Sequence, residues 1–226
     1  MNAAPNAIPT ASDPITVPAR PGRRSRRRLL FALCALALVV LTLLWWVGVF
    51  GGNVREVVPG RFYRSAQLSG FTLRNALEKN GIRSVINLRG PRKEGFYRSE
   101  MDVCRALGVA HYDVSLSAVH LPPPAGMRAL LDDLDRAPKP VMVHCQGGSD
   151  RAGLVSTLYE VIYEGVPLDR AEAEQLTWRY GHLAFTKTRA MDRFFDLYRQ
   201  TGQGEDLRSW TLRTYPSVYA RETARR

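Results

Sequence analysis

Residues 29–50 form an uninterrupted apolar run without a charged side chain. As an α-helix, these 22 residues extend roughly 33 Å, slightly more than the ~30 Å hydrocarbon core of a bilayer. A helix in a soluble core seldom has apolar side chains on every face over such a length. The run therefore predicts one transmembrane helix over residues 29–50.

An arginine cluster, Arg23–Arg28, directly precedes this run. Such clusters stay on the cytoplasmic side of a membrane, which places the rest of the chain on the non-cytoplasmic (periplasmic) side. The run is longer than the core of a cleaved signal peptide, and no small-x-small site closes it, so we expect an uncleaved signal anchor. Residues 25–30 resemble a twin-arginine signal, which keeps an export role open.

The chain divides into four parts, one of which is this helix. Residues 1–28 lack apolar periodicity and are expected to be a disordered, basic cytoplasmic tail. Residues 54–204 have the mixed composition of one domain. Residues 205–226 are a C-terminal tail whose aromatic side chains suit docking on the domain or on lipid. Only residues 51–53 separate membrane from domain, so the domain is expected to lie close to the bilayer.

Short apolar runs and helical patterns alternate between residues 54 and 204. Strands are predicted at residues 54–58, 61–63, 84–88, 110–116 and 141–144. Helices are predicted at residues 72–80, 94–107, 124–137, 152–164, 169–179 and 186–201. This alternation predicts an α/β fold with a central, largely parallel sheet flanked by helices, preceded by the transmembrane helix.

Composition narrows the possible functions. The formal charge of +11 is concentrated at the arginine-rich ends, and no nucleic-acid recognition motif accompanies it, so no nucleic-acid partner is expected. The three cysteines are irregularly spaced, which argues against a disulfide framework or a zinc site. We expect no metal and no cofactor. The oligomeric state stays open.

Between the last apolar strand and the following helix lies the segment His144-Cys145-Gln146-Gly147-Gly148-Ser149-Asp150-Arg151. A thiol attacks a phosphate ester only when ionised, and an ordinary cysteine has a pKa of about 8.5. A loop entering a helix N-terminus supplies N–H groups and a positive dipole end, which stabilise both thiolate and phosphate. Gly147 and Gly148 let several N–H groups turn toward one anion, while Arg151 can hold two phosphate oxygens. His144 is expected to help keep Cys145 ionised.

This His-Cys-x5-Arg pattern resembles the signature of the cysteine-dependent protein tyrosine phosphatase superfamily, especially its dual-specificity-like bacterial and atypical branch. Residues 60–67 (GRFYRSAQ) and 85–89 (VINLR) are similar to segments of such domains. The resemblance extends over about residues 54–199. The Gly-x-Asp-Arg end of the loop resembles branch members that act on phosphotyrosine and phosphoinositides.

The resemblance implies that Cys145 is the nucleophile, forming a phosphocysteine, and that Arg151 clamps the transition state. It assigns phosphate binding to the loop residues Gln146, Gly147, Gly148, Ser149, Asp150 and Arg151. Ala152 departs from the family, which usually has a Ser or Thr whose hydroxyl assists departure of the thiolate. A weak or inactive phosphate-binding pseudophosphatase is therefore one alternative. A rhodanese-like sulfurtransferase, which also has a cysteine loop between strand and helix, is another.

The general acid is left open by the sequence. Asp150 lies in the loop, Asp113 precedes the 115–124 segment where the family often places its acid, and His120 is a third candidate. Arg64 and Arg89 are expected to hold neighbouring loops, and His111 and His182 to be structural or surface residues. The expected substrates are a phosphotyrosine protein or a membrane lipid phosphate.

Overall fold

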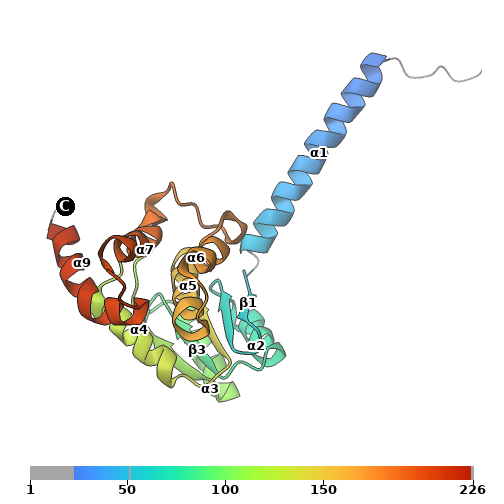
Figure 1. Cartoon of the computed structure of the whole chain (residues 1–226). Coiled ribbons are helices and arrows are strands. Elements are labelled where there is room, and N and C mark those ends of the chain that lie inside the picture. The colour runs from blue at the N-terminus through green and yellow to red at the C-terminus, as the bar shows by residue number, and fades with distance from the viewer. Residues whose placement is uncertain (1–22, 51, 225–226) are drawn as a thin grey trace, which may run out of the picture. The chain divides into compact units, whose positions relative to one another are not determined.

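The computed structural model describes residues 23–50 and 52–224. Residues 1–22, most of the predicted disordered tail, lie outside the described residues. The chain divides into two compact units, Met1–Leu43 and Leu44–Arg226. The described part of the first unit is helical, and the second contains an α/β domain (Figure 1).

Helix α1 runs from Arg23 to Phe50 and contains the whole apolar run. Its apolar side chains between Leu29 and Leu44 are exposed, for example Leu38 at 67%. The window Arg27–Leu44 is long and apolar enough to cross a membrane, a property that signal sequences near an N-terminus share. Helix α1 is therefore a candidate membrane span.

The domain is built on a five-stranded sheet in the order β1-β2-β5-β3-β4. Its strands are β1 Arg55–Val58, β2 Phe62–Ser65, β3 Ser84–Asn87, β4 Ala110–Asp113 and β5 Val141–His144. Strands β1 and β2 pair antiparallel, whereas the other neighbouring pairs are parallel. The predicted α/β fold with a largely parallel sheet is confirmed.

Helices cover both faces of the sheet (Figure 1). Helices α2 Gly70–Lys79 and α3 Gly95–Leu107 pack on one face, against Met142. The larger core on the other face includes Val143 and side chains from α4 Pro124–Arg136, α5 Asp150–Glu164, α7 Ala190–Thr201 and α9 Tyr215–Ala224. Because strand side chains alternate, Met142 and Val143 enter different clusters, and His144 points to the α2–α3 face.

The chain between α6 (Leu168–Gln175) and α7 differs from the predicted pair of long helices. It contains two 3₁₀ turns instead, η1 Trp178–Tyr180 and η2 Lys187–Arg189. Gly181, with φ +86°, ends the first turn in the left-handed region that favours glycine. We call residues 178–189 the connecting segment.

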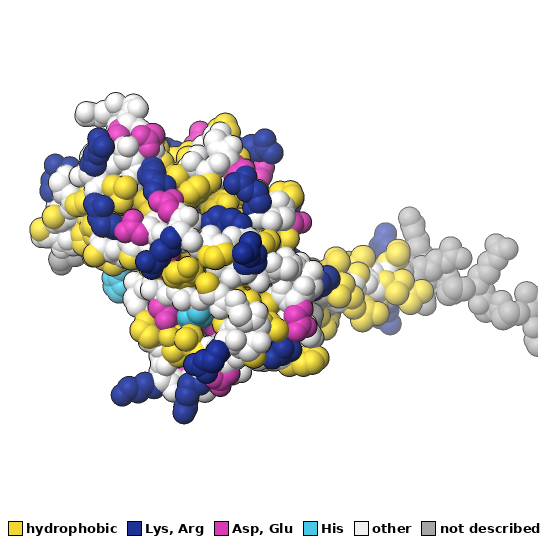
Figure 2. All heavy atoms as spheres, turned by 90° about the horizontal axis from the view of Figure 1, so that it is seen from below, with side chains coloured by type: hydrophobic (Ala, Val, Ile, Leu, Met, Phe, Trp, Pro, Cys, Tyr) yellow, Lys and Arg dark blue, Asp and Glu magenta, His cyan; other side chains and the backbone are white. Residues whose placement is uncertain are grey.

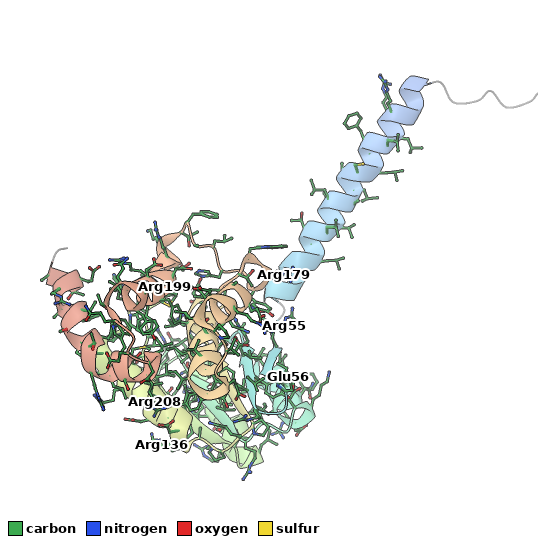
Figure 3. The ribbon with its side chains drawn as sticks, in the orientation of Figure 1. Arg55, Glu56, Arg136, Arg179, Arg199 and Arg208 are labelled. Carbon is green, nitrogen blue, oxygen red and sulfur yellow. The ribbon has the colours of Figure 1, made fainter. Side chains whose placement is uncertain are left out.

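The C-terminal residues pack on the domain. A short helix, α8 Leu207–Ser209, leads through a π-helical turn, η3 Trp210–Thr214, into α9. Trp210 and Tyr215 are completely buried, and the Tyr215 hydroxyl donates to the Pro122 carbonyl oxygen at 2.7 Å. Arg208, labelled in Figure 3, forms an ion pair with Asp135 at the end of α4. Leu207, Trp210, Tyr215 and Val218 thus belong to the larger core.

Charged side chains are dispersed over the domain surface. Figure 2 shows Lys and Arg side chains scattered among acidic and hydrophobic ones on the face seen from below. A nucleic-acid backbone favours one continuous stripe of basic side chains. On the described part of that face, the basic side chains do not form such a stripe.

Candidate active site

The predicted phosphate loop connects the end of β5 to the start of α5. Cys145 directly follows β5 and is 2% exposed. Gly148 has φ +69°, and a Cβ atom there would lie 2.6 Å from the backbone nitrogen of Ala66. The loop therefore turns tightly against the end of β2, at a position where only glycine fits.

The four carbonyl oxygens that follow Cys145 have donors outside the loop. The Gln67 N–H donates to Gln146 O at 3.2 Å, and the Asn53 Nδ2 donates to Gly147 O at 3.1 Å. The Arg64 guanidinium donates to Gly148 O at 2.7 Å and to Ser149 O at 2.9 Å. In a trans peptide the N–H group points opposite to the carbonyl oxygen. The following amides are thereby directed away from these donors, which is the arrangement of an anion-binding nest at a helix N-terminus.

Arg64 is a buried support for the loop. It has no exposed surface, and its Nη1 also donates to Gln175 O at 2.8 Å. Its guanidinium lies 4.6 Å from the centre of the Tyr180 ring. Burial lowers the pKa of Arg64 to about 10, opposed by nearby negative groups, so it stays charged at neutral pH. The sequence anticipated a loop-holding Arg64, and these bonds show which loop it contacts.

Arg151 lies in the first turn of α5 and is 8% exposed. Its Nη1 donates to the Leu116 carbonyl oxygen at 3.2 Å, which fixes the side chain beside the segment after β4. Its buried Nε has no hydrogen-bond partner within the described residues. The side chain is thus held in place with donor capacity left for an anion.

His144 belongs to a buried polar network centred on Glu100 of α3. Glu100 Oε1 lies 2.9 Å from His144 Nε2 and 2.7 Å from His111 Nε2, and its Oε2 accepts from Gln67 Nε2 at 2.6 Å. Burial opposes ionisation of Glu100, but these hydrogen bonds outweigh it and lower its pKa to about 2. An ionised Glu100 therefore fixes the imidazole that precedes Cys145.

Asp113 is engaged at both carboxylate oxygens. Oδ1 accepts from Asn87 Nδ2 at 2.8 Å, and Oδ2 accepts from the Tyr97 hydroxyl at 2.5 Å. Burial, followed by the bond to Asp113, raises the pKa of Tyr97 to about 12. His120, the third acid candidate, lies on the exposed loop after β4, with Nδ1 3.0 Å from the Ser117 hydroxyl.

Asp150 meets a side chain whose importance the sequence did not indicate. Its Oδ1 lies 2.8 Å from His182 Nδ1, and His182 Nε2 lies 3.0 Å from Asp192 Oδ2 of α7. Burial lowers the pKa of His182, but hydrogen bonds to the two carboxylates prevail and raise it to about 9. At neutral pH a protonated imidazole therefore lies between two carboxylates, beside the phosphate loop.

The structure thus groups Cys145, Arg151, Asp150 and the loop amides around the N-terminus of α5, with His144 behind them. It places Asp113 at the end of β4, bonded to Asn87 and Tyr97 and 3.8 Å from His111 Nδ1. Sequence reasoning missed Asn53, Glu100 and His182 as supports of the site. These residues lie 94, 44 and 32 positions from the residues they hold, so no local pattern could have indicated them.

Comparison with known proteins identifies the class to which this arrangement belongs. The model of the tyrosine phosphatase family matches residues 48–176, more than half of the chain. The chain therefore belongs to the tyrosine phosphatase family, as its His-Cys-x5-Arg signature indicated. No curated protein sequence matches it significantly.

Solved structures agree on the fold. TpbA from P. aeruginosa is 20% identical, with a TM-score of 0.51, and the match covers 63% of this chain and 84% of TpbA. The core catalytic domain of the PP-IP phosphatase SIW14 from S. cerevisiae is 18% identical, with a TM-score of 0.51, and the match covers 69% of this chain and 94% of that domain. At such low identity these similarities concern the fold alone.

Proposed function

We propose that this chain is a membrane-anchored, dual-specificity-like phosphatase that hydrolyses phosphate monoesters through a phosphocysteine at Cys145. The observation that carries this proposal is the loop after β5, whose four carbonyl groups are held outward by Gln67, Asn53 and Arg64. A loop held in this way offers its amides to a tetrahedral anion beside a thiol and the Arg151 guanidinium.

The proposed reaction has two steps. Sγ of Cys145 forms a bond to phosphorus while the ester P–O bond breaks and the leaving oxygen takes a proton. Water then forms a new P–O bond while the S–P bond breaks, which releases phosphate and restores the thiolate. Ala152 is completely buried and offers no hydroxyl to assist this second step, so we expect the phosphocysteine to accumulate.

Asp150 is the proposed general acid. Its Oδ2 makes no hydrogen bond within the described residues, whereas both oxygens of Asp113 accept hydrogen bonds. In the proposed transfer, Asp150 carries a proton on Oδ2 when the substrate is bound and gives that proton to the leaving oxygen. Its Oδ1 keeps the contact with the protonated His182, which stabilises the carboxylate that results. The contact of 2.8 Å between Asp150 and His182 supports this route.

Helix α1 is proposed to be an uncleaved signal anchor, with the phosphatase domain on the non-cytoplasmic side. Arg23–Arg28 at the start of α1 support this orientation. A reporter that is active only outside the cytoplasm, fused after Arg226, should be active. Activity of a cytoplasm-only reporter at the same position would contradict the orientation.

The substrate is either a phosphotyrosine protein or a membrane lipid phosphate.

The phosphatase assignment is tested with the full-length protein and a soluble aryl phosphate. Cys145→Ser should abolish hydrolysis and retain binding of inorganic phosphate. Cys104→Ser is the matched control, because Cys104 is also buried but lies in α3, where burial raises its pKa to about 12. Its hydrolysis should equal that of the wild type.

Two outcomes would favour the alternatives. Phosphate binding by the wild type without turnover would identify a pseudophosphatase, as Ala152 allows. Turnover of thiosulfate without phosphatase activity would identify a rhodanese-like sulfurtransferase.

A further inference from the structure

We propose that the connecting segment, residues 178–189, is a bilayer-contact surface that presents the phosphate loop to phosphomonoester head groups of an anionic membrane. This inference rests on the proposed phosphatase function and selects lipid phosphate as its substrate class. It is carried by the composition of the segment, its attachment to the chain that follows α1, and its bonds to the phosphate loop.

The composition of the segment suits a lipid interface. Its basic residues are Arg179, Lys187 and Arg189, and it contains no Asp or Glu. Two aromatic side chains are largely exposed, Trp178 at 61% and Phe185 at 86%. Aromatic rings favour the membrane–water interface, and basic side chains are attracted to anionic lipids. In Figure 1 the segment is the orange connection between α6 and α7.

The segment is bonded to the chain just after α1. Helix α1 ends at Phe50, and the Nδ2 of Asn53 donates to the Tyr180 carbonyl oxygen at 3.1 Å. Three residues at ~3.5 Å each reach about 10 Å. If α1 spans a bilayer, this bond therefore keeps Tyr180 close to the membrane surface. Arg55 and Arg179, labelled in Figure 3, are exposed and lie close in sequence to the bonded pair.

Two residues of the segment, Tyr180 and His182, contact the phosphate loop or its supports. The Nδ2 of Asn53 that donates to Tyr180 also donates to Gly147 O at 3.1 Å. The Tyr180 ring lies against Arg64, and His182 is bonded to Asp150. These bonds fix the position of the phosphate loop relative to the segment. Contact of the segment with a membrane would therefore also set the position of the phosphate loop relative to that membrane.

The surface also reaches the other border of the site. Lys187 and Arg189 line a cavity together with Val119, which is 41% exposed on the loop after β4. That loop begins beside Leu116, whose carbonyl oxygen holds Arg151. The cavity, which Asp196 also lines, therefore joins the segment to the loop that leads to Arg151. A bilayer would bury the exposed ring of Phe185 at its interface. A soluble phosphopeptide would bury little of this ring.

The test uses the full-length chain in nanodiscs of phosphatidylcholine and phosphatidylglycerol, with phosphatidic acid as the lipid probe and a soluble aryl phosphate as the reference. The variant Phe185→Ala/Lys187→Gln/Arg189→Gln should lower kcat/KM for phosphatidic acid by about 25-fold, since each of the two cations removed contributes about fivefold near an anionic surface. Hydrolysis of the aryl phosphate should be unchanged. Phe71→Ala/Arg74→Gln is the matched control, with Phe71 77% exposed on α2, and should resemble the wild type on both probes.

A second measurement does not depend on activity. Amide hydrogen exchange of residues 178–189 should be slower in these nanodiscs than in nanodiscs of phosphatidylcholine alone. Unchanged exchange would overturn the proposal, as would an equal loss on both probes or a wild-type preference for a phosphotyrosine peptide over phosphatidic acid. A wild type that fails to hydrolyse the aryl phosphate would instead refute the phosphatase function itself.

Discussion

Gly148→Ala is the most informative single change in the phosphate loop. Gly148 has φ +69°, and a Cβ there would lie 2.6 Å from Ala66 N, 2.7 Å from Ser65 C and 2.8 Å from Ser65 O. All three atoms belong to the backbone, and Ser65 pairs with His144 in the sheet, so they cannot rotate away. The loop itself must therefore move.

The size of the effect follows from these distances. The added methyl group needs about 3.4 Å, so the loop must shift by close to 1 Å, in addition to the ~1–2 kcal/mol cost of the left-handed conformation. A misplacement of about 1 Å lowers catalysis on the order of 100-fold. We expect a fall of this size in kcat for an aryl phosphate, together with a lower melting temperature.

Gly147→Ala provides the matched comparison. Gly147 lies outside the left-handed region, and its Cβ would meet only the Ser149 hydroxyl, at 3.2 Å. That hydroxyl can rotate, so activity should fall only a few-fold. Steady-state kinetics and thermal unfolding of both variants in the same detergent decide the matter. Equal activity of the two variants would refute the argument that the contact with β2 shapes the loop.

Three further predictions concern the groups around the loop. Arg64→Lys removes the fork that holds Gly148 O and Ser149 O, so kcat/KM for an aryl phosphate should fall by about tenfold or more; wild-type kinetics would show that a point charge suffices. The pKa of His182 is raised from 6.5 to about 9, so its bonds stabilise the fold fully below pH 6.5 and are lost as the pH rises through about 9. Thermal unfolding across this range should show that the wild type loses at most about 3 kcal/mol of stability that does not depend on pH in His182→Asn. If the stability of the two proteins changes in parallel with pH, the bonds of His182 are not the source of the pH dependence. Asp150→Asn should slow esters with poor leaving groups by about 10²–10⁴-fold and good ones far less; if Asp113→Asn has this pattern instead, Asp113 is the acid.

The sequence predicted those parts of the molecule that local patterns specify. The alternation of apolar runs gave the sheet, and the strand–loop–helix arrangement from His144 to Arg151 placed the cysteine loop correctly between β5 and α5. The supports of the loop were not predictable in this way. Asn53 lies 94 residues from Gly147, and their contact depends on how the strands are ordered in the sheet, which no local pattern specifies.

The predicted end of the helix at residues 169–179 was wrong for a related reason. Residues 169–179 have helical periodicity, but α6 ends at Gln175, whose side chain and carbonyl oxygen both accept from Arg64. A buried guanidinium needs these acceptors, and the tertiary hydrogen bonds outweigh the local preference to continue the helix.

The burial of Trp210 and Tyr215 links the order of synthesis to activity. Both rings contact Phe194 of α7, and Tyr215 also holds Pro122 in the segment that follows Leu116. A growing chain makes these two aromatic residues after the whole phosphate loop. The segment beside Arg151 therefore gains this support only after residue 215 has been made.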